Sequence, residues 1–511
     1  MSKELATREP SGRDLGARAA RGASVVLGGQ SARLLLQIAG IVLLARLLNP
    51  SDYGVLAMVT AIIGVAEVLR DFGLAPAAIQ APTLSSQERS NLFWLNGLIG
   101  LLLSGLVAAA ALPIAYLYGD ASLAMVVIAL APVYLLNGFS TQLRAHLSRE
   151  FRFGALVGAE LLGQAAGLAV GLAMAFLGYG YWALVAMQLT QAFVILIAIA
   201  SVGRWVPGAY RRSTPIGHFV RYGSSLLATQ LVIYASANVD SILIGLRYGA
   251  SQLGQYNRAF QMLILPLNQL TSPATRVALP VLSRLQHDPA RFSRYMARGQ
   301  LCLAWLVLPV FTFTAANAAP VVDLVLGPGW NGVVPLFQIL AVGGCFQALS
   351  YTTQWAFLAM GRTNSNLKFA AITRSGMIIL IITGSFIGPL GVAAAYSVSV
   401  ALIWIAGLWW INLFLAVPSA VLIAQGLRTL GVMSAIAGSM LLLHTVVVID
   451  SDWLELIASA VVAGVVFALA LTIPAIRRDV AAVLGVVKTV VDRRRRVAPG
   501  APEHEGMESS E

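Results

Sequence analysis

The chain has 511 residues, of which 58% are hydrophobic and 11% are charged; its mean hydropathy is +0.79 and its formal net charge is +12. A soluble domain carries charge on about a quarter of its residues, so this composition excludes a water-soluble globule. Apolar runs of about 18 residues or more recur along the chain, and each can cross about 30 Å of hydrocarbon as a helix. The sequence therefore predicts a polytopic membrane protein. We attribute the positive net charge to membrane topology rather than to nucleic-acid binding.

The apolar runs are bounded by glycine, proline and charged residues, and they give an all-α fold with about fourteen transmembrane helices. The predicted spans lie at 22–47, 54–80, 91–117, 121–142, 154–177, 181–203, 222–247, 255–282, 299–325, 332–359, 366–388, 391–414, 428–449 and 453–475.

Lysine and arginine are concentrated in alternate connections between these spans, as the positive-inside rule requires. The opposite connections hold Arg247 alone. The basic side contains the N-terminal arm, Arg89, Arg144, Arg149, Arg152, Arg204, Arg211, Arg212, Arg221, Arg284, Arg291, Arg294, Arg298, Arg362, Lys368, Arg428 and the tail from Arg477 to Arg496. We therefore expect an even number of spans and two cytoplasmic termini.

An internal repeat appears when the chain is shifted by 200 residues, because NPSDYG at 49–54 then falls on GASQLG at 249–254. An even number of spans in each half makes the two repeats parallel. The sequence predicts two six-helix lobes around a central cavity, followed by two further helices. The predicted segments are a cytoplasmic basic arm at 1–21, lobes at 22–215 and 216–415, the additional helices at 416–476 and a cytoplasmic tail at 477–511.

The tail sequence DVAAVLGVVKTVVD places its valines and leucine on one helical face and is followed by four arginines. This pattern indicates an interfacial helix with a basic clamp for anionic lipid. The alternative is a solvated tail.

The motifs that could indicate an enzyme or a cofactor site lack the structural context that such sites need. GPGWNG at 327–332 fits a dinucleotide pattern, but no strand precedes it, and DSD at 450–452 lies in a short turn. Cys302 and Cys345 lie in apolar runs without metal-ligand spacing, so we expect them to pack between helices. The sequence predicts a non-enzyme without a metal, a cofactor or an ATP-binding motif.

The eighth span carries Pro266, Pro273 and Pro280, seven residues apart, so that each removes a backbone hydrogen bond near one helical face. Such a span can serve as a hinge. The alternative is a set of static kinks that shape the bundle.

Charged residues inside the spans are the main functional signal, because each costs about 2.5–3.5 kcal/mol at the helix centre and therefore faces a cavity or a partner. In the stretch VAEVLRDFGLA, three of these charges lie on one helical face. At the 200-residue offset Leu and Thr occupy the same places, so the architecture alone does not require them. The intramembrane charges are Arg33, Glu67, Arg70, Asp71, Glu160, Asp240, Arg258, Arg276 and Arg374.

Three segments resemble one known family: NPSDYG at 49–54, EVLRDFGL at 67–74 and GQYNRAFQ at 254–261. They resemble bacterial polysaccharide flippases of the multidrug/oligosaccharidyl-lipid/polysaccharide exporter superfamily, in the colanic-acid, succinoglycan and xanthan exporter branch. The resemblance covers nearly the whole membrane region, but not the tail. It implies a multi-pass protein of the bacterial inner membrane that moves undecaprenyl-diphosphate-linked oligosaccharide repeat units to the periplasmic leaflet by alternating access.

The resemblance also implies roles for side chains inside the spans, since arginine forks bind diphosphate and polar side chains meet sugar hydroxyls. For each arginine, a structural ion pair is the alternative. The predicted substrate-binding cations are Arg33, Arg70, Arg276 and Arg374. The predicted sugar-facing groups are Gln30, Gln37, Asn238, Gln261, Asn268 and Gln269. The predicted coupling or gating carboxylates are Glu67, Asp71, Glu160 and Asp240.

The family further suggests membrane lipids, a polysaccharide polymerase and a chain-length regulator as partners. Two other function classes stay open. A drug or small-molecule exporter of the same superfamily would need a compact pocket for amphipathic cations, which the basic interior argues against. A membrane polysaccharide polymerase or ligase would need a large exoplasmic loop, whereas the predicted exoplasmic connections are short.

Overall fold

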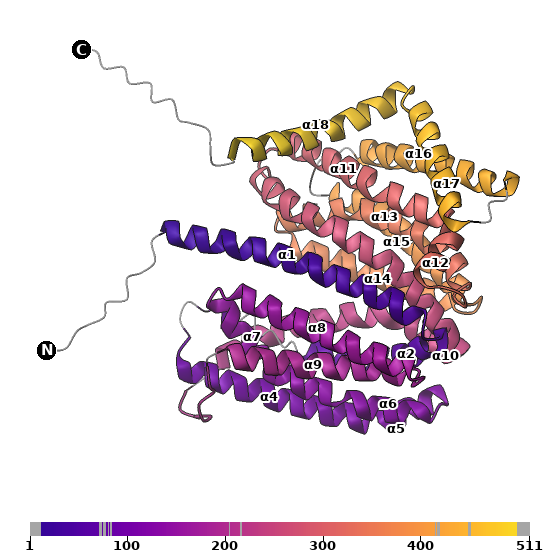
Figure 1. The fold of residues 1–511 in the computed structure, drawn as a ribbon. Helices are drawn as coiled ribbons and strands as arrows, with labels where there is room; N and C mark the ends of the chain where they lie inside the picture. The colour runs from indigo at the N-terminus through magenta and orange to yellow at the C-terminus, as the bar shows by residue number, and fades with distance from the viewer. Residues whose placement is uncertain are drawn as a thin grey trace, which may run out of the picture. The chain divides into compact units, whose positions relative to one another are not determined.

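The computed structural model describes residues 12–70, 74, 78–79, 81, 84–203, 205–214, 217–413, 415, 419–447 and 451–497, and every regular element among them is a helix (Figure 1). The predicted coupling residue Asp71 lies outside the described residues. The helices are α1 (Gly12–Ala45), α2 (Pro50–Arg70), α4 (Ser86–Ala109), α5 (Ala111–Tyr118), α6 (Ser122–Leu130), α7 (Pro132–Arg149), α8 (Phe153–Phe176), α9 (Trp182–Val202), α10 (Gly217–Arg284), α11 (Pro289–Ala316), α12 (Ala318–Val325), α13 (Val333–Ala359), α14 (Thr363–Gly384), α15 (Pro389–Ile411), α16 (Ser419–Val446), α17 (Asp452–Ala470) and α18 (Pro474–Val497).

Twelve segments of the described chain are long and apolar enough to cross a membrane, and each coincides with a predicted span. The remaining two predictions, 222–247 and 255–282, fall on α10, which runs from Gly217 to Arg284. The predicted connection between them is confirmed, because the helical segments of α10 meet at a break at Gly249, where φ is 79° and ψ is −178°. Glycine adopts this conformation without steric cost.

Several helices begin with side-chain caps that the sequence supplies. The Ser85 hydroxyl accepts from the Glu88 backbone N–H at the start of α4, and the Glu88 carboxylate accepts from the Ser85 N–H. At the start of α11 the Asp288 carboxylate accepts from the Arg291 backbone N–H, and Pro289 is the first helical residue. Because of this cap, α11 begins ten residues before the predicted span 299–325, and Arg294 and Arg298 lie on the helix rather than in a connection.

The chain divides into two compact units. Unit 1 contains residues 1–258, 322–333 and 381–392, and unit 2 contains residues 259–321, 334–380 and 393–511. The lobe boundaries that the repeat suggests stay a prediction.

In unit 1, α8 packs along α9, α4 along α7, and α1 along α8 (Figure 1). The α8–α9 contact is close because α8 presents Gly163, Gly167 and Gly171 to its neighbour. A Cβ at Gly167 would lie 2.7 Å from the Met187 carbonyl oxygen, and one at Gly171 would lie 3.1 Å from the Met187 Cβ. The glycine stripe therefore lets the two helices pack closely.

The two repeat turns meet in unit 1 through a reciprocal contact. A Cβ on Gly54 would strike the carbonyl oxygen of Ala250, and a Cβ on Gly254 would strike the carbonyl oxygen of Pro50. Each partner is related to the other by the 200-residue shift, as in an interface with two-fold symmetry. We infer that these turns occupy equivalent places in the two repeats.

In unit 2, α11 packs against α16, α17 and α18, and α16 packs against α17. The start of α18 is fixed to α16 by Arg428, whose Nε donates to Asp479 Oδ2 over 2.7 Å. The sequence had placed Arg428 in a connection before the span 428–449, and that boundary was wrong. The helix begins at Ser419, so the arginine lies within it and pairs with the acid of the next segment.

The free thiols of Cys302 and Cys345 are half-buried and buried, respectively, as expected of packing residues.

Candidate functional site

The predicted site residues fall into both units. Several of those in unit 1 contact one another or neighbouring polar groups, and these contacts form the candidate site. Unit 1 holds Gln30, Arg33, Gln37, Glu67, Arg70, Glu160, Asn238 and Asp240, and unit 2 holds Gln261, Pro266, Asn268, Gln269, Pro273, Arg276, Pro280 and Arg374.

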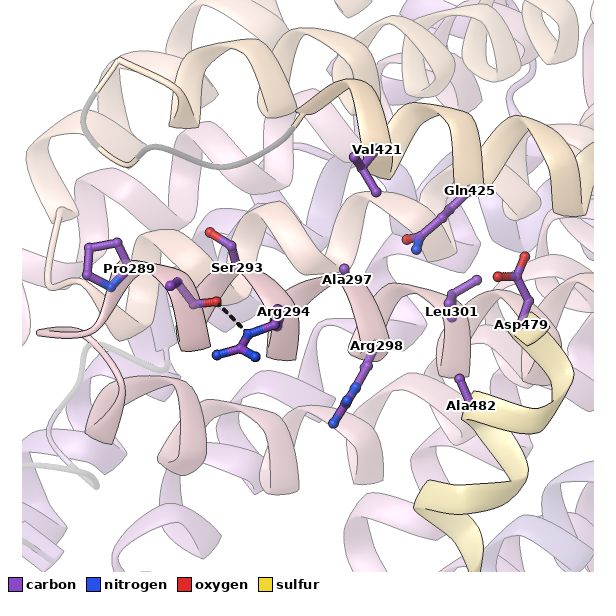
Figure 2. A pocket seen from close by; sticks show the side chains of 11 residues that line it. Pro289, Ser293, Arg294, Ala297, Arg298, Leu301, Val421, Gln425, Asp479 and Ala482 are labelled. Carbon is purple, nitrogen blue, oxygen red and sulfur yellow. Dashed lines mark hydrogen bonds between the residues drawn. The ribbon is translucent and has the colours of Figure 1, made fainter. Parts of the chain in front are cut away.

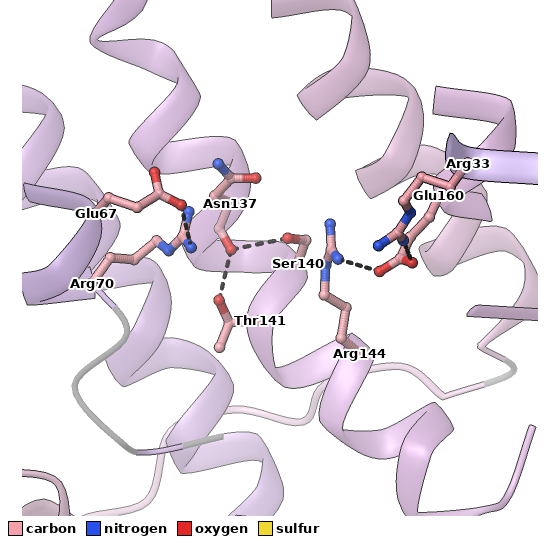
Figure 3. Close-up of polar contacts among 8 residues, drawn as sticks. All are labelled: Arg33, Glu67, Arg70, Asn137, Ser140, Thr141, Arg144 and Glu160. Atoms are coloured by element: carbon pink, nitrogen blue, oxygen red, sulfur yellow. Dashed lines mark hydrogen bonds and ion pairs between the residues drawn. The ribbon is translucent and has the colours of Figure 1, made fainter. Parts of the chain in front are cut away.

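Glu160 on α8 lies between two arginines from different helices (Figure 3). Its Oε1 accepts from Arg144 Nη1 on α7 over 2.8 Å, and its Oε2 accepts from Arg33 Nη2 on α1. We call Arg33, Arg144 and Glu160 the arginine–glutamate cluster. Two cations and one anion leave it with a formal charge of +1.

Arg144 was not predicted as a site residue, because the sequence placed it in a basic connection after the span 121–142. The structure extends α7 to Arg149, and α8 begins at Phe153. Arg144 is therefore about 8 Å from the end of α7, and Glu160 is about 11 Å into α8. The two residues are therefore at similar distances from the connection between α7 and α8. With the correct helix ends, these distances would have predicted the contact.

Both guanidinium groups of the cluster stay accessible while they bind the same carboxylate. The exposed fraction is 41% for the Arg33 side chain and 32% for Arg144, but only 18% for Glu160. An anion can therefore reach the two cations while the acid lies behind them. Since one carboxylate fixes both arginines, their forks are oriented before any anion arrives.

A second charged group lies on α2, where Arg70 Nη2 donates to Glu67 Oε1 over 2.7 Å. We call these two residues the α2 pair. Here the exposure is reversed, because the Glu67 side chain is 50% exposed and the Arg70 side chain is 12% exposed. The pair is neutral and presents its acidic member.

The helix α7 packs against both α2 and α8 and carries polar side chains between the two charged groups (Figure 3). The hydroxyls of Ser140 and Thr141 donate to the Asn137 carbonyl oxygen over 3.0 and 2.8 Å. The side-chain amide of Asn137 has no hydrogen bond within the described part of the chain, so it can bond to a sugar or phosphate oxygen. Asn137 was another group that the sequence did not single out.

The predicted coupling residue Asp240 is 5% exposed and lies apart from these contacts. Its Oδ2 accepts from the Tyr256 hydroxyl over 2.7 Å, across the α10 break, and its Oδ1 accepts from the Ser241 N–H. Arg258, two residues beyond Tyr256, lies over the Tyr53 ring at 3.7 Å. These contacts satisfy Asp240 within α10.

The other predicted residues vary in exposure. Gln30, Asn268 and Arg276 are exposed, whereas Gln37, Gln261, Gln269 and Arg374 are half-buried. The Asn238 amide donates to the Tyr234 carbonyl oxygen over 2.9 Å and so is partly occupied. The three prolines lie in α10 beyond its break at Gly249, and their hinge role stays a prediction. Among the described residues, no group of His, Cys, Asp and Glu could hold a metal ion.

Comparison with known proteins gives one family and several relatives. A family described as "Polysaccharide biosynthesis protein" matches residues 43–335. The lipopolysaccharide biosynthesis protein WzxC of Escherichia coli K12 is 25% identical over 365 residues, covering 69% of this chain and 72% of WzxC. The teichuronic acid biosynthesis protein TuaB of Bacillus subtilis 168 is 26% identical over 365 residues, covering 67% of this chain and 72% of TuaB.

Solved structures share the fold at low sequence identity. The lipid II flippase MurJ in an inward closed conformation has a TM-score of 0.68 and 14% identity, and the match covers 89% of this chain and 99% of MurJ. An inward-facing multidrug resistance MATE family transporter has a TM-score of 0.59 and 13% identity, covering 74% of this chain and 93% of the transporter. The all-α polytopic fold predicted from the sequence is confirmed.

Proposed function

The chain belongs to the polysaccharide biosynthesis protein family, and we propose that it is a flippase that moves lipid-linked oligosaccharide repeat units from the cytoplasmic to the periplasmic leaflet. The proposed substrate carries its sugars on undecaprenyl diphosphate, and the products are exopolysaccharide or lipopolysaccharide. The relatives named for lipopolysaccharide and teichuronic acid biosynthesis support this assignment.

The arginine–glutamate cluster is the observation that carries the proposal. A diphosphate needs more than one accessible cation away from bulk water, and arginine binds phosphate oxygens with two parallel hydrogen bonds. Arg33 and Arg144 supply two such forks from different helices, held by one carboxylate. The net charge of +1 favours an anion, whereas an amphipathic cationic drug would be repelled.

In the proposed cycle, the diphosphate takes the exposed faces of both guanidinium groups and competes with Glu160 for them. When the diphosphate leaves, Glu160 binds both arginines again, so that the empty site is not left as a bare pair of cations. This exchange limits affinity and allows release, which a transporter needs as much as binding. Within unit 1, Asn137, Gln30 and Gln37 are the polar side chains that we propose for the sugar.

We propose that transport proceeds by alternating access and draws on a cation or proton gradient. The predicted coupling residues are Glu67, Asp71, Glu160 and Asp240. Among the described three, Glu67 is the most exposed. Proteoliposomes that transport undiminished without an ion or voltage gradient would rule out coupling.

We further propose that the chain lies in the bacterial inner membrane with both termini in the cytoplasm and that it is not an enzyme. The distribution of Lys and Arg along the sequence supports this orientation. A polymerase and a chain-length regulator are proposed partners, since they would use the exported repeat unit.

The test is deletion of the gene, followed by measurement of lipid-linked repeat units on each leaflet and of surface polysaccharide. We expect repeat units to accumulate on the cytoplasmic leaflet and surface polysaccharide to fall. Complementation with the wild-type chain should restore both, and the R33Q/R144Q variant should restore neither at equal expression. Unchanged polysaccharide with altered drug sensitivity would favour a drug exporter. Repeat units that still reach the periplasmic leaflet, together with a loss of polymer length alone, would favour a polymerase.

A further inference from the structure

A groove in unit 2 is formed by three helices (Figure 2). Its volume is about 850 Å³, which is within the usual range for a small-ligand site. In Figure 2, Val421 and Gln425 come from α16, Asp479 and Ala482 come from the start of α18, and the rest of the lining lies along α11.

The lining changes in character along α11. Pro289 marks the first residue of the helix and Leu301 lies ~18 Å further along its axis. Arg294 and Arg298 lie between them, one turn apart, and both are exposed. Apolar groups at Ala297, Leu301 and Val421 form the other part of the wall. The groove thus joins a cationic region to an apolar region that extends into a predicted span.

The charges of this groove are not balanced by the acid on its wall. Asp479 is bound by Arg428 from α16 and is therefore already neutralised. Arg294 donates from Nε to the Ala290 carbonyl oxygen and has no ion pair within the described residues. Arg298 has no ion pair or hydrogen bond in that same part of the chain. Two cations are left for an anionic group.

We infer that this groove binds an anionic phospholipid of the cytoplasmic leaflet, with the phosphate at Arg294 and Arg298 and an acyl chain along Ala297, Leu301 and Val421. The positive-inside distribution assigns this end of α11 to the cytoplasmic surface, where anionic lipids attract basic side chains. The helix α18 continues from the groove with exposed Arg477, Arg478 and Lys488, which extend the basic surface. A lipid with a single negative headgroup fits both the charge and the apolar path.

The binding test uses the full-length purified protein in detergent, with dioleoyl phosphatidylglycerol or dioleoyl phosphatidylcholine added, and native mass spectrometry as the readout. We expect wild-type protein to retain phosphatidylglycerol in preference to phosphatidylcholine. R294Q/R298Q should bind phosphatidylglycerol about 25-fold more weakly, since each surface cation contributes about fivefold. The matched control R211Q/R212Q removes two exposed arginines of unit 1 and should bind as wild type does.

A second variant tests the apolar path without changing charge. A297W places a large side chain in the groove and should weaken phosphatidylglycerol binding although both arginines remain. Thermal unfolding and elution profiles identify variants that fold. Equal retention of the two lipids, or wild-type retention by R294Q/R298Q and A297W, would overturn the inference. Displacement of the phospholipid by inorganic phosphate, or by undecaprenyl diphosphate at equal concentration, would also overturn it and would indicate a simple anion site or a substrate path.

Discussion

The arginine–glutamate cluster and the α2 pair both pair arginine with glutamate, and α7 packs against the helices that carry their carboxylates. In the cluster two partly exposed arginines share a more buried acid, whereas in the pair a half-exposed acid covers a buried arginine. The first arrangement presents excess positive charge, and the second presents a neutral contact with its acidic side outward. A charged residue inside a span is therefore informative only when its partner and the exposure of both are known.

The largest effect should come from removing both cations of the cluster. R33Q/R144Q leaves Glu160 without a counter-ion and removes two charge-assisted contacts to phosphate, so transport of lipid-linked repeat units should fall about 100-fold or more. Flipping in proteoliposomes at matched protein content measures this. R211Q/R212Q serves as the charge-matched control. Transport near the wild-type rate in R33Q/R144Q would show that the cluster is structural only.

Neutralising Glu160 of the cluster should lower the stability of the protein more than neutralising Glu67 of the α2 pair does. E160Q leaves two neighbouring cations without a counter-ion, and we expect a loss of about 2 kcal/mol, seen as a lower apparent Tm. E67Q alters a half-exposed carboxylate and should change stability by less than about 0.5 kcal/mol. Thermal unfolding of the two purified variants gives the comparison directly, and equal shifts would contradict it.

E160Q should also bind the diphosphate more tightly, because the competing carboxylate is gone. Equilibrium binding of undecaprenyl diphosphate should strengthen by about fivefold, while turnover falls because release is slower. Binding and flipping must be measured on the same preparation. Weaker binding in E160Q would mean that Glu160 orients the arginines without competing for them.

The single substitution R70Q should affect transport less than R144Q does. Arg70 is largely covered by its surroundings, so we expect flipping to stay within about threefold of the wild type. A loss as large as that of R144Q would restore Arg70 to the substrate site, as the sequence suggested.

The smallest effect is expected from exchanging the members of the α2 pair. E67R/R70E keeps the neutral contact at neighbouring positions on the helix face, and flipping should remain within about twofold of the wild type. Loss of coupling to an ion gradient in E67R/R70E, with binding unchanged, would instead identify the pair as a gate.

Much of the fold could be predicted from the sequence, because a bilayer restricts spanning segments to long apolar helices. Twelve predicted spans coincide with helices of that kind. The ends of helices were less predictable: α7 and α16 contain Arg144 and Arg428, since each arginine pairs with an acid from a later helix. Hydropathy assigns such residues to connections because it cannot detect a partner.

The candidate site was predictable in part. Arg33 and Glu160 were identified because charge inside a span is costly, but their contact depends on which faces of α1 and α8 meet. Arg144 required the length of α7, and Asn137 required knowing that α7 packs between charged neighbours. A local pattern contains none of this information.

The reciprocal contact between Gly54 and Gly254 has a consequence for how the chain tolerates mutation. Each glycine faces a backbone carbonyl rather than a movable side chain, so neither can accept Ala even when the other is unchanged. The exposed neighbours Ser51 and Ser251 occupy matching places in the same turns and are not constrained in this way. In a library of single substitutions, two narrow intolerant positions should therefore recur 200 residues apart beside permissive ones, as a mutational signature of the duplicated turn.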